Sequence, residues 1–180
     1  MNKDVLISIR PQWVELIAAG TKYAELRKSE PNIQTPFTAY IYQTRVTWAF
    51  DFLRSIGLNG LAERLEGALG MVVGEFTCDY VTRHKFYQSN SDPVFDPEPR
   101  ESYIPGVNLD AVCLKEYQIL DYGAGKSLYS WHISDLKIYD RPKRLNEFRS
   151  ASGQPITRAP QSWCYVQKIS KESHNGTSAF

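Results

Sequence analysis

The chain has 180 residues, of which 42% are hydrophobic and 13% aromatic, and its formal net charge at pH 7 is +1. This length and composition suit one domain with a substantial core, and the near-zero charge excludes a globally basic nucleic-acid binder, so any RNA site has to be a local groove. The three cysteines, Cys78, Cys113 and Cys164, are widely spaced and form no C-x-x-C pair, so the sequence indicates neither a disulfide framework nor a zinc site. This pattern suits a protein of the reducing cytoplasm.

The first 28 residues predict a strand, a short helix and a second strand. Residues 5–9 form an apolar, β-branched run of strand length, and Pro11 then stands where the first turn of a helix needs no N–H. Apolar residues recur at helical spacing until Gly20, which is typical of a helix end. Residues 23–27 alternate between polar and apolar side chains, which is the pattern of a half-buried strand.

The middle of the chain predicts two more strands around a helical insertion. Residues 37–43 are rich in β-formers, and residues 71–80 form the longest strand-like run. Gly74 inside that run indicates a bulge or a close approach of another backbone. Between these strands, apolar residues at 48–70 recur at helical intervals around a turn-like Gly-Leu-Asn-Gly sequence, so two short inserted helices are expected.

The second half of the chain predicts a long loop, a helix and two strands. Residues 82–108 are polar and proline-rich, and a loop of this length is usually functional or mobile, which makes it a candidate lid. A helix is expected at 111–122, a strand at 127–139 and a closing strand at 162–169. Residues 171–180 are polar and predict a flexible tail.

No apolar run in the sequence approaches the length of a membrane span, and the N-terminus lacks the apolar core of a signal peptide. We therefore expect a cytoplasmic protein with no membrane partner. The residue pattern also predicts no metal site and indicates no cofactor. The sequence leaves the oligomeric state open.

Lys22, Glu25 and Arg27 are the sharpest candidates for chemistry. Glu25 and Arg27 are two residues apart on a predicted strand, so they point to the same side, and Lys22 at the start of the strand can reach across that face. A carboxylate beside two cations can orient a base edge or act as a general base, while the cations can hold phosphate. The alternative is an exposed strand face with ordinary surface ion pairs, which contribute little.

A strand is followed by a helix with the sequence R-P-x-W and then by the sequence G-x-K-x-x-E-x-R at residues 20–27. This order resembles the signature of the ASCH domain, a branch of the PUA-like superfamily. The resemblance continues in G-E-F at residue 74, S-W-H-I-S-D-L at residue 130 and P-Q-S-W at residue 160. It implies a single α+β domain over residues 1–170, built on a small, mostly antiparallel PUA-like β-barrel with flanking helices and a long loop.

The resemblance also implies a function in a cleft at one end of the barrel. Some ASCH members are acetylcytidine amidohydrolases, and others bind or degrade RNA. Lys22 matches the lysine of the amidohydrolases, but Glu25 occupies the position of their threonine, and Glu116 is the nearest counterpart of their acidic residue. We therefore expect RNA or a modified nucleoside to bind in the cleft. The alternative is a hydrolase, either a nucleoside amidohydrolase or a ribonuclease, that uses Lys22 and a carboxylate.

Aromatic, cationic and hydroxyl side chains on three other predicted strands are expected to border the same cleft, because a tryptophan face can stack on a base and an arginine can bind phosphate. For Trp131 and Trp163, packing in the core is an equally open alternative. For Trp13 and Trp48, core packing is favoured. A lone histidine is more often structural than a proton shuttle, and His84 has no partner that the sequence identifies. The bordering residues are Ser8, Arg10, Trp131, His132, Ser162 and Trp163.

Overall fold

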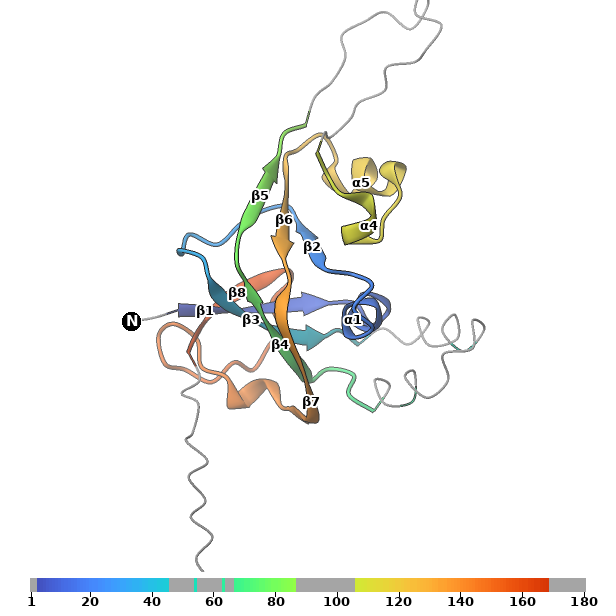
Figure 1. The fold of residues 1–180 in the computed structure, drawn as a ribbon. Coiled ribbons are helices and arrows are strands. Elements are labelled where there is room, and N and C mark those ends of the chain that lie inside the picture. Colours follow the sequence, from blue (N-terminus) through green and yellow to red (C-terminus); the bar gives the residue numbers. More distant parts are fainter. Residues whose placement is uncertain (1–2, 46–53, 55–62, 64–66, 87–105, 169–180) are drawn as a thin grey trace, which may run out of the picture.

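The computed structural model describes residues 3–45, 54, 63, 67–86 and 106–168. They form a mixed α+β structure with two β-sheets and a few short helices (Figure 1). Most of the helical insertion predicted at 48–70, most of the loop predicted at 82–108 and the whole tail at 171–180 lie outside the described residues. Within the described ranges, no helix has both the length and the apolar character needed to cross a membrane.

The larger sheet contains the strands with the strongest apolar runs. Its strand order is β7-β4-β3-β1-β8, in which β1 and β3 are parallel and the other neighbours are antiparallel. Nearly every residue of β1 and β3 is buried, as expected for central strands covered on both faces. The strands are β1 (Lys3–Ile9), β3 (Phe37–Gln43), β4 (Val72–Cys78), β7 (Ser134–Lys143) and β8 (Trp163–Gln167).

The smaller sheet has the order β2-β6-β5 and is antiparallel throughout, with β2 (Ala24–Arg27), β5 (Val81–His84) and β6 (Leu128–His132). Its register pairs Glu25 with Trp131 and Ala24 with His132. Because side chains alternate along a strand, Glu25 and Arg27 share one face of this sheet with Trp131, and Ser130 and His132 lie on the other face.

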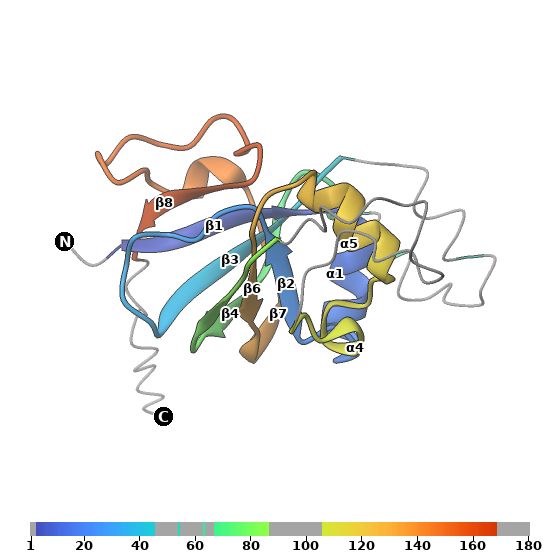
Figure 2. The same ribbon diagram turned by 90° about the horizontal axis from the view of Figure 1, so that it is seen from above.

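The three short α-helices of the described residues gather on one side of the sheets in both ribbon views (Figures 1 and 2). Helix α1 (Pro11–Ala18) begins at the predicted proline. The helix predicted at 111–122 is instead two helices, α4 (Leu109–Val112) and α5 (Glu116–Gly123), because Cys113 has a left-handed backbone with φ of 54° that ends the first one. A 3-10 turn, η1 (Leu145–Glu147), precedes β8.

Strand pairing corrects two further predictions. The first part of the loop predicted at 82–108 is strand β5, since Val81–His84 pairs with β6. The segment predicted as one strand at 127–139 is divided between β6 and β7, which belong to different sheets. Strands β1 and β4 lie in one sheet, as the family resemblance requires, with β3 between them. The closed barrel stays a prediction.

The core of the larger sheet packs against the inner face of the smaller one. Trp131 is fully buried there, with its ring edge-to-face against Phe37 at 5.6 Å between centroids. Trp163 packs against Trp131 at 5.8 Å. These aromatic contacts join the two sheets and fix the position of β2, which carries the candidate site.

Gly74 is required by the pairing of β4 with β7. The register shifts on both sides of it, and a Cβ added at Gly74 would lie 2.5 Å from the backbone oxygen of Lys137. We expect Gly74→Ala to lower the free energy of unfolding by about 1–3 kcal/mol, because the neighbouring strand has to move. Thermal unfolding measures this effect. Lys137→Ala is the control, because it keeps the same backbone carbonyl and removes only an exposed side chain. Equal melting temperatures for the two variants would contradict the requirement for glycine at position 74.

Candidate functional site: a cationic cavity beside β2

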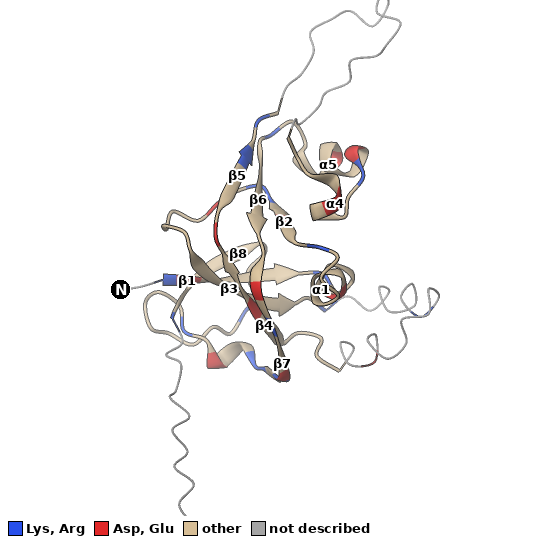
Figure 3. Cartoon of the chain, in the orientation of Figure 1, with Lys and Arg blue, Asp and Glu red and all other residues tan. Residues whose placement is uncertain are grey.

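A cavity of about 660 Å³ lies between β1, α1, β2 and α5. Four cationic residues and one carboxylate line it, although positive and negative residues are interspersed over the described chain as a whole (Figure 3). The excess positive charge is therefore local. We call this space the cationic cavity, and its principal lining residues are Ser8, Arg10, Trp13, Lys22, Glu25, Arg27, Lys28, Thr44, Tyr122 and Ser162.

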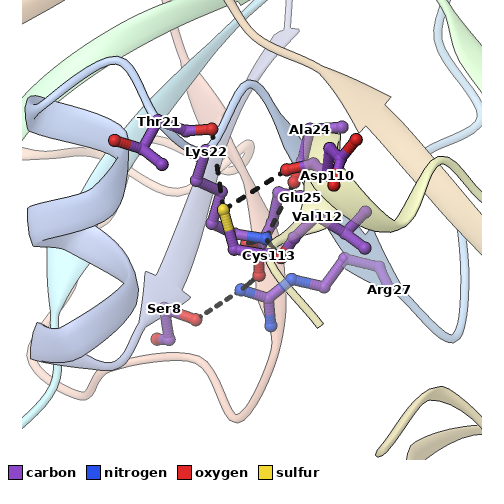
Figure 4. Close-up of polar contacts among 9 residues, drawn as sticks. All are labelled: Ser8, Thr21, Lys22, Ala24, Glu25, Arg27, Asp110, Val112 and Cys113. Atoms are coloured by element: carbon purple, nitrogen blue, oxygen red, sulfur yellow. Dashed lines mark hydrogen bonds and ion pairs between the residues drawn. The ribbon is translucent and has the colours of Figure 1, made fainter. Parts of the chain in front are cut away.

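Local structure brings the three motif residues together. The Gly20 turn ends α1 and directs the chain back, and the Lys22 backbone N–H donates to the Leu16 carbonyl. Strand alternation then places Glu25 and Arg27 on the same side of β2. Figure 4 shows the three side chains close together. All three are buried, so they are not the exposed ion pairs of the alternative interpretation.

The Lys22 ammonium is held entirely by protein acceptors. Its Nζ donates to the carbonyl oxygens of Ala24 at 2.8 Å and Val112 at 2.7 Å, and it lies 3.3 Å from Oε2 of Glu25. It also lies 5.6 Å from the centre of the Trp13 ring. A protonated lysine has three N–H donors, so these three acceptors use its full capacity. Lys22 thereby ties α4 to β2.

Arg27 contacts Ser8, Glu25 and Ser162, and a side-chain hydrogen bond also links it to Tyr122. Its Nη2 donates to the Ser8 carbonyl at 2.7 Å and lies 2.9 Å from Oε1 of Glu25 (Figure 4). Its Nη1 is 3.5 Å from the Ser162 hydroxyl, which is a weak contact. Within the described residues, Nε is buried and has no hydrogen-bond partner. A guanidinium carries five N–H donors, so Arg27 retains donor capacity in the wall of the cavity.

Two aromatic rings form apolar parts of the wall. Trp13 comes from α1 and Tyr122 from α5, and the Lys28 ammonium lies 5.0 Å from the centre of the Tyr122 ring. Burial raises the pKa of Tyr122, and the charge of Arg27 only partly opposes this rise. The Tyr122 hydroxyl therefore keeps its proton at neutral pH and can donate a hydrogen bond.

Some of the residues expected to border the cleft line the cationic cavity, and others do not. Arg10, Ser8 and Ser162 line it together with the three motif residues. Trp131 does not, because its side of β6 faces the core.

Three other candidates also lie away from the lining. The Trp163 indole N–H donates to Ser29, and the ring packs against the core. Glu116 is exposed at the start of α5, and His132 faces the other side of its sheet and pairs with Asp79.

Several lining residues were not predicted as part of the site. Trp13 was expected in the core, and its partly buried ring does pack against the core, but it also forms part of the cavity wall. Thr44, Gln118 and Tyr122 come from segments far from β2 in the sequence, and nothing in their local pattern marks them. The R-P-x-W sequence is the one signal that could have identified Trp13, because it places the ring one helical turn beyond Arg10.

Glu15 on α1 is a buried carboxyl whose two oxygens have no hydrogen-bond partner among the described residues. Burial raises its pKa above the ordinary 4.5. A carboxyl whose pKa is raised by folding binds more protons in the folded chain than in the unfolded chain. The free energy of unfolding therefore falls as the pH rises above the pKa that the carboxyl has in the unfolded chain.

We expect Glu15→Gln to increase the free energy of unfolding at pH 7–8, by on the order of 1 kcal/mol, and to have a smaller effect near pH 4. Thermal unfolding across this pH range tests the sign. Glu30→Gln removes an exposed carboxylate and is the matched control. A loss of stability at neutral pH in Glu15→Gln alone would mean that the Glu15 carboxylate has a stabilising partner.

Comparisons with known proteins bear on the fold. No family model matches the sequence, and neither does any curated protein. Three solved structures of the ASCH protein from Zymomonas mobilis do match in structure. A tyrosine-to-phenylalanine mutant covers 93% of this chain and 92% of its own, with a TM-score of 0.56 and 18% identity.

The other two structures match this chain to a similar degree. The ASCH protein from Zymomonas mobilis itself has a TM-score of 0.56 at 18% identity, over 92% of this chain and 88% of its own. A serine-to-alanine mutant has a TM-score of 0.55 at 18% identity, over 92% and 89%. The described structure therefore has an ASCH-like fold.

Proposed function

We propose that the cationic cavity binds RNA or a nucleoside-like ligand. Its volume of about 660 Å³ lies within the usual range of small-molecule sites. Arg10, Arg27 and Lys28 supply charge for phosphate, and the rings of Trp13 and Tyr122 offer faces for a base. The ASCH-like fold and the sequence resemblance are consistent with this class of ligand.

The observation that carries the proposal is the excess of cations in the cavity lining, where Arg10, Arg27 and Lys28 stand beside the single carboxylate of Glu25. A phosphate group of a ligand can balance this excess positive charge. Arg27 is already fixed by Ser8 and Glu25, so its remaining donors are pre-oriented. A phosphate or a base carbonyl can accept hydrogen bonds from these donors.

The hydrolase alternative places different demands on Lys22. A lysine that acts as a nucleophile or base has to offer an unprotonated amine to the ligand. The ammonium of Lys22 is used by Ala24, Val112 and Glu25, so we assign it a positioning role. The binding proposal needs no reactive amine.

Salt-dependent RNA binding tests the proposal. We expect Arg10→Ala and Lys28→Ala each to weaken binding of short single-stranded RNA and to reduce the slope of log K against log salt by about 0.7, because each loses one phosphate contact. Arg83→Ala removes an exposed arginine on β5 outside the cavity and should match the parent protein. Equal losses for all three variants would indicate a diffuse surface instead of this cavity.

A further inference from the structure

A second, smaller cavity lies on the opposite face of the β2-β6-β5 sheet from Glu25 and Arg27. Its volume is about 120 Å³, which is below the usual range of nucleotide-sized sites. Two histidines and a serine line it, together with Tyr23 and the turn at Gly106. We call it the histidine cavity, and it has no part in the proposed RNA site.

Ser130 and His84 form a hydrogen-bonded pair in this cavity. The Ser130 Oγ lies 2.7 Å from Nε2 of His84, across the strand pair β6 and β5. His84 is buried and Ser130 is partly accessible. A serine hydroxyl within hydrogen-bond reach of an imidazole is the arrangement in which the imidazole can take the proton as the oxygen attacks.

A second imidazole stands next to this pair. His132 follows Ser130 by two residues, so it lies on the same face of β6. Its Nδ1 lies 3.1 Å from Oδ2 of Asp79, and its ring stacks on Tyr80 at 4.6 Å between centroids. A carboxylate and a stacked ring fix the orientation of this imidazole, and an N–H of an oriented imidazole can donate to a developing oxyanion.

We propose that the histidine cavity is a site of acyl transfer, in which Ser130 is the nucleophile, His84 its general base and short-chain acyl esters the substrate class. Ser130 Oγ bonds to the carbonyl carbon while its proton passes to Nε2 of His84. The bond to the leaving alkoxide then breaks, and His84 returns the proton to that oxygen to release the alcohol. Water hydrolyses the acyl-serine by the same route: His84 takes its proton, the carboxylic acid leaves and Ser130 regains its hydrogen.

The size of the cavity sets the substrate class. Only a short acyl chain fits a space of about 120 Å³, and the alcohol part has to extend toward solvent. Thr82 and Tyr23 are exposed at its edge. The Tyr23 hydroxyl accepts a hydrogen bond from the Asn108 amide, so its own proton is available to a carbonyl oxygen.

Incubation of the full chain with p-nitrophenyl acetate tests the proposal. We expect release of p-nitrophenol above the buffer rate, with an acetyl group on Ser130 found by mass spectrometry of the digested protein. Ser130→Ala should lose both signals. His84→Gln keeps a hydrogen-bonding side chain but no base, and it should slow release about 100-fold or more.

Ser134→Ala is the matched control, because Ser134 donates to the Thr77 carbonyl outside both cavities and its loss should leave the rate unchanged. The acetyl position in the parent protein needs no variant and stands even if His84→Gln fails to fold. An acetyl group on another residue, or no release above buffer, would overturn the proposal. RNA binding by the same samples is independent of this result, so the two proposals fail separately.

Discussion

Replacing Lys22 by methionine is expected to lower the free energy of unfolding by about 3–5 kcal/mol, because it removes one partner of a buried ion pair. The substitution keeps most of the side-chain volume. It leaves the Glu25 carboxylate with one cation instead of two, and it leaves the Ala24 and Val112 carbonyls without the donor that joins α4 to β2. Denaturant unfolding followed by circular dichroism measures the loss.

Lys28→Met is the control for this prediction, since it removes an exposed lysine just beyond the other end of β2. It should change stability by no more than about 0.5 kcal/mol. Glu25→Gln in the Lys22→Met background should recover part of the loss, because it removes a buried charge that has become undercompensated. Near-parental stability of Lys22→Met would show that the three contacts of the ammonium contribute little.

Replacing Arg27 by lysine is expected to weaken RNA binding about 10- to 100-fold, although the charge is kept. One ammonium cannot hold the Ser8 carbonyl and Glu25 while it also presents donors to a ligand, whereas the planar guanidinium can. The measurement is a titration with short single-stranded RNA, made beside a thermal melt that reports any loss of folded protein.

Arg83→Lys makes the same exchange on an exposed part of β5 and should bind RNA as the parent does. The comparison separates a pre-oriented guanidinium from charge alone. If Arg27→Lys binds as tightly as the parent chain at low and at high salt, the spare donors of Arg27 are not used by the ligand.

Local patterns predicted the centre of the site. Period-2 alternation at residues 23–27 is enough to place Glu25 and Arg27 on one side, and the structure brings them within contact of each other and of Lys22. The same rule, applied to β6, separates Trp131 from Ser130 and His132. Trp131 has polar neighbours in sequence because the two faces of its strand meet different surroundings.

Features that depend on distant contacts could not be predicted in the same way. The helix expected at 111–122 breaks at Cys113, which has a left-handed backbone without the glycine or asparagine that usually marks one. Tyr122 reaches the cavity only because Lys22 and the small sheet hold the α4–α5 segment in place. The partner of His84 was not evident, since the pairing of β5 with β6 brings Ser130 to it from 46 residues away.

Photo-crosslinking tests the central claim most directly. Short single-stranded RNA that contains thiouridine, irradiated in the presence of the full chain, should form bonds to the aromatic walls of the cationic cavity, and mass spectrometry should locate them at Trp13 or Tyr122. Arg27→Lys should reduce their yield in proportion to its lost affinity. Crosslinks confined to residues outside the cavity, such as Tyr129 on the face beside Arg83, would contradict the account.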